Sequence, residues 1–181
     1  MKKIIRFLSA TAVFATAAVV HAQVYFEASV AGLNAQKSVQ AIHYEAKPSI
    51  FSGLIGYQIH PNLAIEGYLG AGAGNATMTE NGINYGEEFN FDSSFGVFAK
   101  PRLEVSNDME LFMRLGYLQN KISYSNINKM MLNEAQSSVA VGLGANYYFD
   151  SRTYVTGSYM SYNNKSGFKL NGLSIGLGYK F

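Results

Sequence analysis

The sequence predicts an all-β fold, an eight-stranded antiparallel transmembrane β-barrel. Three observations point to this class. Residues near the carboxyl terminus alternate between large apolar and small or polar side chains, which is the period of a β-strand. The first residues have the composition of an export signal. Charged residues make up only 14 % of the 181-residue chain, well below the roughly 25 % of an ordinary soluble domain.

The closing segment shows the alternation most clearly. Large side chains occupy every second position, and three of the five positions between them are glycine, which suits a crowded lumen better than a wet surface. A barrel also explains why no segment after the leader reaches the about 20 apolar residues of a membrane helix, because apolar residues at alternate positions dilute hydropathy. The large residues are Leu173, Ile175, Leu177, Tyr179 and Phe181.

The amino-terminal segment is predicted to be a secretory signal peptide. Three basic residues within the first six precede an apolar run over residues 7–20, and Ala22 supplies a small residue at the expected cleavage point. We therefore expect a cleaved signal peptide over residues 1–22 and an outer-membrane barrel domain over residues 23–181. The chain has no cysteine, which excludes a lipoprotein anchor. The leader's basic residues account for the excess of 14 Lys and Arg over 12 Asp and Glu, so no nucleic-acid partner is implied.

Eight alternating segments follow one another along the chain. Short turns at residues 60–62, 106–108 and 150–152 alternate with longer polar loops, as in barrels that combine tight periplasmic turns with external loops. An even strand number then leaves both termini in the periplasm. The predicted strands cover residues 24–34, 49–59, 63–74, 89–105, 109–120, 135–149, 153–162 and 170–181.

Strand phase assigns each residue to the lipid or to the lumen. In the fourth strand the alternation places Phe91 outward and Asp92 inward. Pro101 lacks an amide donor and predicts a bulge or an early end of pairing. The seventh strand alternates too weakly to fix its phase. With no tryptophan in the chain, the periplasmic aromatic belt would consist of Tyr57, Tyr147, Phe149, Tyr179 and Phe181.

Five charged residues are predicted to face the lumen at similar height. An eight-stranded barrel is just wide enough inside to be filled by side chains, and buried charges must be paired. We therefore predict a salt-bridge layer that fills the lumen and has a structural role rather than a conducting or catalytic one. Its members are Glu27, Glu66, Lys100, Arg102 and Arg114.

The histidines argue against an enzyme. A nucleophile needs a positioned base beside it, but His43 lies in a predicted external loop, near Ser38 and Ser49, and His60 in a predicted periplasmic turn. The two histidines are also too far apart to bind a metal ion together. We predict no catalytic residue, no metal site and no cofactor.

Four motifs resemble the opacity-type, OmpA-like family of eight-stranded outer-membrane barrels: residues 56–68 (GYQIHPNLAIEGY), 111–117 (LFMRLGY), 142–147 (GLGANY) and 178–181 (GYKF). The resemblance spans the chain after the leader. It implies a place in the outer membrane of a Gram-negative bacterium, with lipid and lipopolysaccharide as neighbours. It also implies that Tyr179 and Phe181 form the signal read by the barrel assembly machinery.

The external loops are the candidate binding surface, because loops on a rigid scaffold commonly carry function. The resemblance to opacity-type adhesins implies adhesion to host cells or host proteins. Four apolar residues of the third loop are candidate contacts, although they fit equally well with longer fifth and sixth strands: Ile127, Met130, Met131 and Leu132. A narrow porin and a structural envelope protein remain alternative functions. A soluble lipocalin-like carrier is the rival fold, and it needs a charged exterior that this sequence does not offer.

Overall fold

A computed structural model describes residues 24–39, 42–125, 131–165 and 167–181, so the predicted signal peptide lies outside the described residues. The described residues contain no helix that is long and apolar enough to cross a membrane. They form ten antiparallel strands: β1 (Val24–Val39), β2 (Ile42–Ala46), β3 (Ser49–His60), β4 (Leu63–Gly72), β5 (Asn75–Glu80), β6 (Ile83–Ser106), β7 (Met109–Ser125), β8 (Met131–Tyr148), β9 (Thr153–Lys165) and β10 (Phe168–Lys180).

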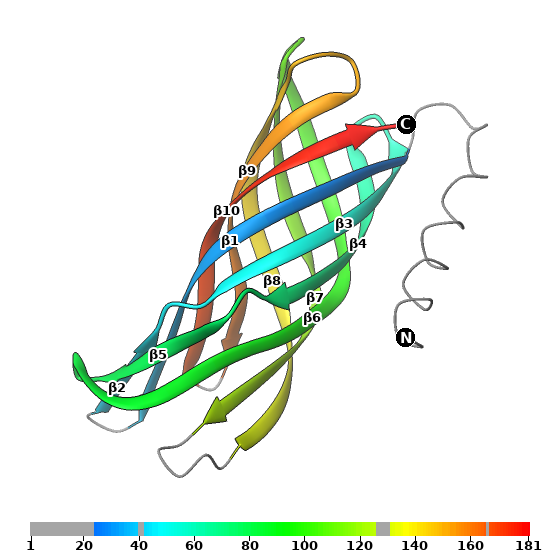
Figure 1. The fold of residues 1–181 in the computed structure, drawn as a ribbon. Helices are drawn as coiled ribbons and strands as arrows, with labels where there is room; N and C mark the ends of the chain where they lie inside the picture. The colour runs from blue at the N-terminus through cyan, green and yellow to red at the C-terminus, as the bar shows by residue number, and fades with distance from the viewer. Residues whose placement is uncertain (1–23, 40–41, 126–130, 166) are drawn as a thin grey trace, which may run out of the picture.

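The strands close into an eight-membered ring (Figure 1). Its order is β10-β9-β8-β7-β6-β4-β3-β1, and β1 pairs with β10 to complete the circle. The two remaining strands prolong this ring at the end opposite the C-terminus, where β1 pairs with β2, β2 with β5, and β5 with β6. The dipeptide Lys47-Pro48 separates β2 from β3, and Ala73-Gly74 separates β4 from β5. The predicted eight-stranded antiparallel barrel is therefore confirmed.

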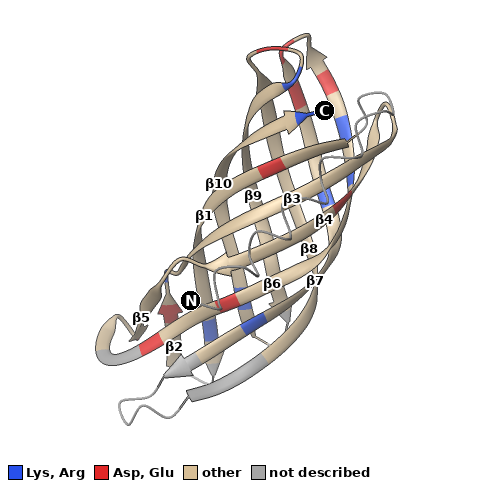
Figure 2. Ribbon diagram, turned by 45° about the vertical axis from the view of Figure 1, so that its right-hand side comes forward, with Lys and Arg blue, Asp and Glu red and all other residues tan. Residues whose placement is uncertain are grey.

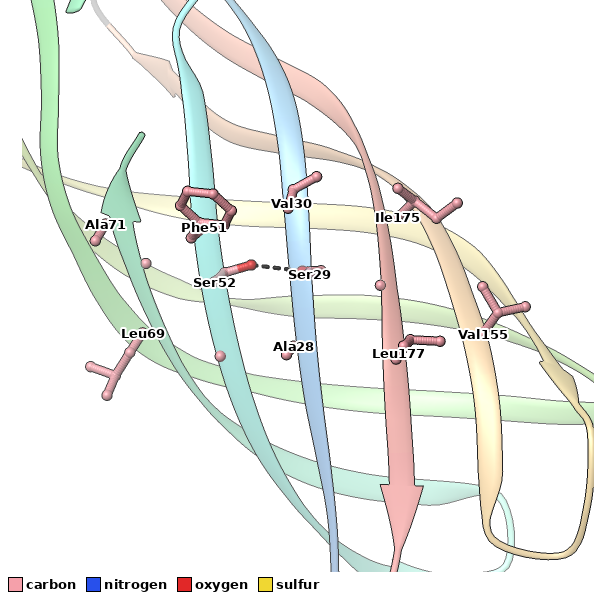
Figure 3. Close-up of a pocket in the computed structure, with 13 residues that line it drawn as sticks. Ala28, Ser29, Val30, Phe51, Ser52, Leu69, Ala71, Val155, Ile175 and Leu177 are labelled. Atoms are coloured by element: carbon pink, nitrogen blue, oxygen red, sulfur yellow. Dashed lines mark hydrogen bonds between the residues drawn. The ribbon is translucent and has the colours of Figure 1, made fainter. Parts of the chain in front are cut away.

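The predicted outward rows lie on the exterior of the wall. Large apolar side chains such as Phe51, Leu69 and Leu143 are more than half exposed, as expected for a surface that faces lipid rather than a protein core. Ala28 and Gly53 are small, and the wall is shallowly hollowed around them between bulkier side chains (Figure 3). The inward rows of the same strands are buried in the lumen.

The fourth predicted strand is wrong in phase at its start. Phe91 is only 2 % exposed and lies inside the barrel, whereas Asp92 is exposed. The cause is a register shift between Phe91 and Ser93 in the pairing of β6 with β7, because one extra residue moves every earlier side chain to the other face. At Pro101 the strand has no bulge, but the alternative of an early end of pairing is confirmed. Leu63↔Pro101 is the last pair of β6 with β4, and the ladder of β6 with β7 has no pair at Pro101 or at the residue before it.

The predicted external loops are largely β-hairpins. β1 extends to Val39, β7 extends to Ser125, and β9 extends to Lys165, each beyond the predicted strand end. Between β5 and β6 the turn consists of Asn81 (φ +47°) and Gly82 (φ +83°), the combination of a two-residue type I′ hairpin. The phase of β9, open from the sequence, is set by buried residues at even positions: Tyr154, Thr156, Ser158, Met160 and Tyr162.

Candidate functional site

The lumen near the C-terminal end holds a buried ionic layer centred on Arg114 of β7. Its guanidinium donates to both carboxylates of the predicted set, with Nε at 2.7 Å from Glu66 Oε2 and Nη2 at 2.5 Å from Glu27 Oε2. Glu27 comes from β1 and Glu66 from β4, so the contact spans the lumen between strands that are not neighbours in the ring. The structure thus brings these three predicted residues together.

Lys100 and Arg102 of β6 complete the layer on its other side. Lys100 Nζ lies 3.2 Å from Glu27 and 3.5 Å from Glu66. Arg102 Nη1 contacts Glu110 Oε2 at 2.6 Å rather than the two predicted carboxylates. Glu110 is buried and is also 3.8 Å from Lys100, which links the two groups of charges. Glu110 is not among the residues predicted from the sequence, although it shares the inward phase of Arg114 on the same strand.

Two tyrosines cover the carboxylates, and two glycines make room for them. Tyr25 donates its hydroxyl to Glu66 at 2.6 Å, and Tyr154 donates to Glu27 at 2.9 Å. A Cβ at Gly56 would lie 2.1 Å from the Tyr25 ring, and one at Gly178 would lie 2.1 Å from the Tyr154 ring. Small residues on the lumen face are therefore needed where rings cross the barrel.

Chemically, the ionic layer is balanced and closed. Three carboxylates face three cations, and tyrosine hydroxyls supply further hydrogen bonds, so each buried charge is compensated. Within the described residues no group of three His, Cys, Asp or Glu could hold a metal ion. Figure 2 shows charged residues concentrated toward the two ends of the barrel, with the middle of the wall largely uncharged.

The opposite half of the lumen is filled mainly by apolar side chains, with a few buried amides such as Asn163, which donates to Gln136 at 2.7 Å. Ile50, Leu170 and Ile122 are almost completely buried there, and the rings of Phe89 and Phe168 lie 6.4 Å apart. Between the two halves lies a short layer of small polar residues, in which Ser158 and Ser174 share a 2.7 Å hydrogen bond. The strands therefore enclose two different fillings, one ionic and one apolar.

The predicted loop contacts lie on the hairpin of β7 and β8. Ile127 and Met130 are outside the described residues. The backbones of Met131 and Leu132 belong to β8, where they pair with Ser125 and Tyr124. The alternative that these two residues extend the strand is therefore correct.

The two histidines have local partners. The exposed ring of His43 lies with Nδ1 2.9 Å from Ser38 Oγ, so the structure does bring together the pair noted in the sequence. His60 Nδ1 accepts the backbone N–H of Asn62 at 3.2 Å and thereby stabilises the turn between β3 and β4.

Aromatic side chains surround the C-terminal end of the wall. Tyr147 packs edge-on against Phe149 with ring centroids 5.8 Å apart, and Tyr179 packs in the same way against Phe181 at 5.3 Å. All four are exposed on the exterior. Exposed aromatic rings in this position match the interfacial girdle of barrels that span a membrane.

A closed antiparallel ring with an apolar exterior and a polar lumen defines a transmembrane β-barrel. The chain belongs to the outer membrane protein beta-barrel domain family, which it matches over residues 6–181. A comparison with curated proteins found no match.

Solved structures share the fold at low sequence identity. Neisserial surface protein A is 17 % identical over 87 % of this chain and 97 % of its own, with a TM-score of 0.65. Ail, the attachment invasion locus protein of Yersinia pestis, is 16 % identical over 90 % of this chain and 100 % of its own, with a TM-score of 0.62. The N-terminal barrel of Pseudomonas aeruginosa OprF is 13 % identical over 86 % and 97 %, with a TM-score of 0.55.

These comparisons confirm the OmpA-like eight-stranded architecture and its location. The protein is a β-barrel of the Gram-negative outer membrane, and its apolar wall lies in membrane lipid. Both termini of an even-numbered barrel lie in the periplasm. The ionic layer is therefore at the periplasmic end, and the prolonged hairpins with their apolar filling are at the extracellular end.

Proposed function

We propose that this protein is a surface protein that presents its extracellular hairpins for adhesion to host cells or host proteins. The observation that carries the proposal is the apolar core of the extracellular half. Ile50, Ile122 and Leu170 pack inside it, and β2 and β5 prolong the ring around it. Because a packed core fixes the strands, the described extracellular parts of the hairpins form a rigid scaffold, as a binding surface requires.

Two proteins with similar structures support this proposal because they are described as surface or attachment proteins. Neisserial surface protein A is a surface protein, and Ail is an attachment invasion locus protein that has been crystallised with the heparin analogue sucrose octasulfate. Ail is therefore an example of this architecture in complex with a sulfated heparin analogue. The present chain has exposed lysines on the outer half of its wall, Lys121 on β7 and Lys169 on β10, which suit anionic surroundings, including lipopolysaccharide.

The ionic layer favours adhesion over a narrow porin. Glu27, Glu66, Lys100 and Arg114 meet across the lumen at distances of 2.5–3.5 Å, which leaves their carboxylates and cations engaged with each other rather than with passing ions. A structural envelope protein without a ligand remains the alternative. Discrete conductance that changes with Arg102 or Arg114 substitution would favour the porin.

An enzymatic role has weaker support than adhesion. The Ser38–His43 contact uses Nδ1 and lies exposed at a hairpin, without a buried acidic partner among the described residues. A catalytic base needs a third group that orients its ring. We accordingly propose that the chain is not an enzyme.

Export and assembly complete the proposal. Residues 1–22 act as a cleaved signal peptide, which amino-terminal sequencing of the membrane-inserted protein would test. Tyr179 and Phe181, packed edge to face at the periplasmic rim, serve as the contact for the barrel assembly machinery. Phe181→Ala should then lower the yield of inserted protein without changing the stability of the fraction that inserts.

Whole-cell attachment tests the adhesion proposal directly. The protein is displayed on a non-adherent bacterium, and binding to epithelial cells and serum proteins is compared with a variant whose residues 126–130 are replaced by Gly and Ser. Met131 and Leu132 stay unchanged because they belong to β8. The adhesion proposal expects the replacement to abolish attachment while heat-modifiable gel migration, a sign of the folded barrel, is retained.

A matched control separates contact chemistry from hairpin length. Ile127→Ser with Met130→Ser removes the two apolar side chains of the segment, whereas Asn126→Ser with Asn128→Ser changes neighbouring polar residues and keeps the length. Attachment should fall for the first pair alone. If every folded variant attaches no better than the host strain without the protein, the adhesion proposal is wrong and the structural role becomes the leading one.

A further inference from the structure

The turn between β5 and β6 consists of the dipeptide Asn81-Gly82 and lies at the extracellular end of the barrel (Figure 1). Both residues are exposed, and both have a positive φ, +47° and +83°. The ladder continues directly on either side of them, where Glu80 pairs with Ile83. The dipeptide is therefore the whole loop of a two-residue hairpin, and it is surrounded by water.

An asparagine that is followed by glycine can react with its own backbone. The amide nitrogen of the glycine attacks the side-chain carbonyl carbon of the asparagine, a carbon–nitrogen bond forms, and ammonia leaves with the proton of that nitrogen. Water then opens the resulting succinimide ring at either of its carbonyl groups. The product is aspartate or isoaspartate, so a neutral amide is exchanged for a carboxylate with water as the only co-reactant.

Two features of this turn favour the attack. Gly82 has no side chain to shield its nitrogen, and a Cβ built on it would meet nothing within 4 Å, so the approach is open. The backbone N–H of His43 donates to Asn81 Oδ1 at 3.1 Å. This donor polarises the side-chain carbonyl and lies where negative charge develops on its oxygen during the attack. The fold thus supplies both an accessible nucleophile and a donor for the oxyanion.

Asn81 also lies at a junction of three hairpins. Its own N–H donates to the carbonyl oxygen of His43 on β2 at 2.8 Å. The ring of His43 lies beside Ser38 of β1, and the Ser38 N–H donates to the carbonyl oxygen of Gly167, between β9 and β10, at 3.4 Å. A charge created at Asn81 would therefore appear where the β1–β2, β5–β6 and β9–β10 hairpins are joined.

The same dipeptide occurs a second time, as Asn171-Gly172 within strand β10. There Gly172 pairs with Leu33 of β1 on one side and with Met160 of β9 on the other. A Cβ at this glycine would lie 2.3 Å from the carbonyl oxygen of Gly32, so the backbone is closely packed. The two ladders hold the chain extended, and the glycine nitrogen cannot turn toward the asparagine side chain without breaking the barrel wall.

We propose that Asn81 is a site of spontaneous deamidation in the folded protein and that Asn171 is protected from the same reaction by its place in the wall. Conversion at Asn81 adds a negative charge to the extracellular surface. Where isoaspartate forms, the side-chain methylene enters the main chain, so the loop between Glu80 and Ile83 becomes longer and no longer fits a type I′ turn. The extracellular surface therefore changes as the protein ages. This inference does not depend on the adhesion function.

Mass spectrometry of the refolded protein in lipid vesicles tests the proposal. The protein is incubated in mildly alkaline buffer and digested at successive times, and the peptides that contain Asn81 and Asn171 are analysed for the mass change from NH₂ to OH. Labelling by isoaspartyl methyltransferase identifies isoaspartate. Asn81 should react more than about tenfold faster than Asn171, because opening an exposed turn costs little, whereas opening a strand of the wall costs much of the global free energy of unfolding.

Two controls separate the fold from the chemistry of the dipeptide. In guanidinium-unfolded protein both sites should react at similar rates, since the wall no longer protects Asn171. Gly82→Asn is the matched variant of the turn, because asparagine also tolerates a positive φ and its side chain shields the attacking nitrogen. The rate at Asn81 should fall severalfold in this variant, while heat-modifiable gel migration shows that the barrel is retained.

Each outcome decides the proposal. Faster reaction at Asn81 in the folded protein, with both sites reactive after unfolding, supports it. Equal rates at Asn81 and Asn171 in the folded protein would show that the fold does not select the site. Absence of reaction at Asn81 in the folded protein would show that the turn protects its own asparagine. Either result overturns the proposal, and so does a rate at Asn81 that Gly82→Asn leaves unchanged.

Discussion

The same ring of eight strands encloses two halves of the lumen that differ in polarity, ionic at the periplasmic end and apolar at the extracellular end. At the periplasmic end, Arg114 and its carboxylate partners lie inside while Leu115 and Met113 face outward. At the extracellular end of the same strand, Ile122 lies inside and Lys121 faces outward. The geometric alternation of β7 is unbroken, but the polarity of its two faces is exchanged.

The exchange follows from what surrounds each half. In lipid the exterior must be apolar, so polar groups are tolerated only inside, where they pair with each other. Above the membrane the exterior meets water, and the interior can become an ordinary apolar core. Strand β10 repeats the pattern, with Leu173 outward in the lipid half and Leu170 inward in the extracellular half. The level of the exchange marks the outer boundary of the membrane-spanning part.

Breaking the ionic layer should have the largest effect. Arg114→Met leaves Glu27 and Glu66 with Lys100 as their main cation, and removing one partner of a buried ionic network costs about 3–5 kcal/mol. Urea unfolding in lipid vesicles measures the loss. Adding Glu66→Gln alone to Arg114→Met should restore much of the stability, because two carboxylates, Glu27 and Glu110, then face the two cations Lys100 and Arg102. A fully stable single variant would contradict the assigned role of Arg114.

The apolar half should respond to a cavity rather than to charge. Leu170→Ala removes a fully buried side chain and should cost about 2–5 kcal/mol. The matched control is Leu173→Ala on the lipid face of the same strand, where acyl chains can fill the space, so its cost should be clearly smaller. The comparison again uses unfolding in vesicles. Similar losses at both positions would mean that the extracellular half has no packed core.

The exterior should distinguish the two halves by the same substitution. Leu143 is 64 % exposed on the lipid face, and Leu143→Arg should cost about 2–4 kcal/mol if it lies near the bilayer midplane. Gln36→Arg, on the exterior of β1 beside Lys169, should change the free energy of unfolding by only a few tenths of a kcal/mol, about the range of ordinary surface substitutions. Equal costs would refute the position given to the membrane boundary.

The sequence predicted the lipid half well because lipid enforces a strict rule. Every outward position there must be apolar, so the phase of Phe51, Leu69 and Leu143 could be assigned without tertiary information. The extracellular half was assigned to loops because its polarity is exchanged and because Gln36 and Lys169 interrupt the apolar rows. The dipeptide Asn81-Gly82 was an available signal of a hairpin, since it matches a type I′ turn.

The ionic layer was predictable in membership but not in pairing. Inward phase and similar height selected Glu27, Glu66 and Arg114, and the same reasoning applied to Glu110 would have found it. Which charges form ion pairs depends on which strands lie opposite each other once the barrel closes, and no local sequence pattern encodes that arrangement. The bulges at Asp92 and Tyr162 are also non-local, because each is defined against a neighbouring strand. Phe91 was misplaced for that reason.

Removing a charge at the periplasmic surface should change the free energy of unfolding least, and it gives a reference for the effects of the buried charges. Asp150 lies in the turn between β8 and β9, where its Oδ1 accepts the backbone N–H groups of Arg152 and Thr153 at 2.7 Å each. These hydrogen bonds to the charged form lower the pKa of Asp150 below its ordinary value. A carboxylate with a lowered pKa in the folded state stabilises the fold above its unfolded pKa of about 4, and loses that contribution as the pH falls through the lower folded value.

NMR titration of the Asp150 side chain should show the lowered pKa, and Asp150→Asn should remove the corresponding acid dependence of stability below about pH 4. Because the group is in water, this dependence should be slight beside the loss caused by Arg114→Met. An ordinary pKa at Asp150 would show that the turn does not hold its carboxylate, and the difference between buried and exposed charges would then rest on the lumen alone.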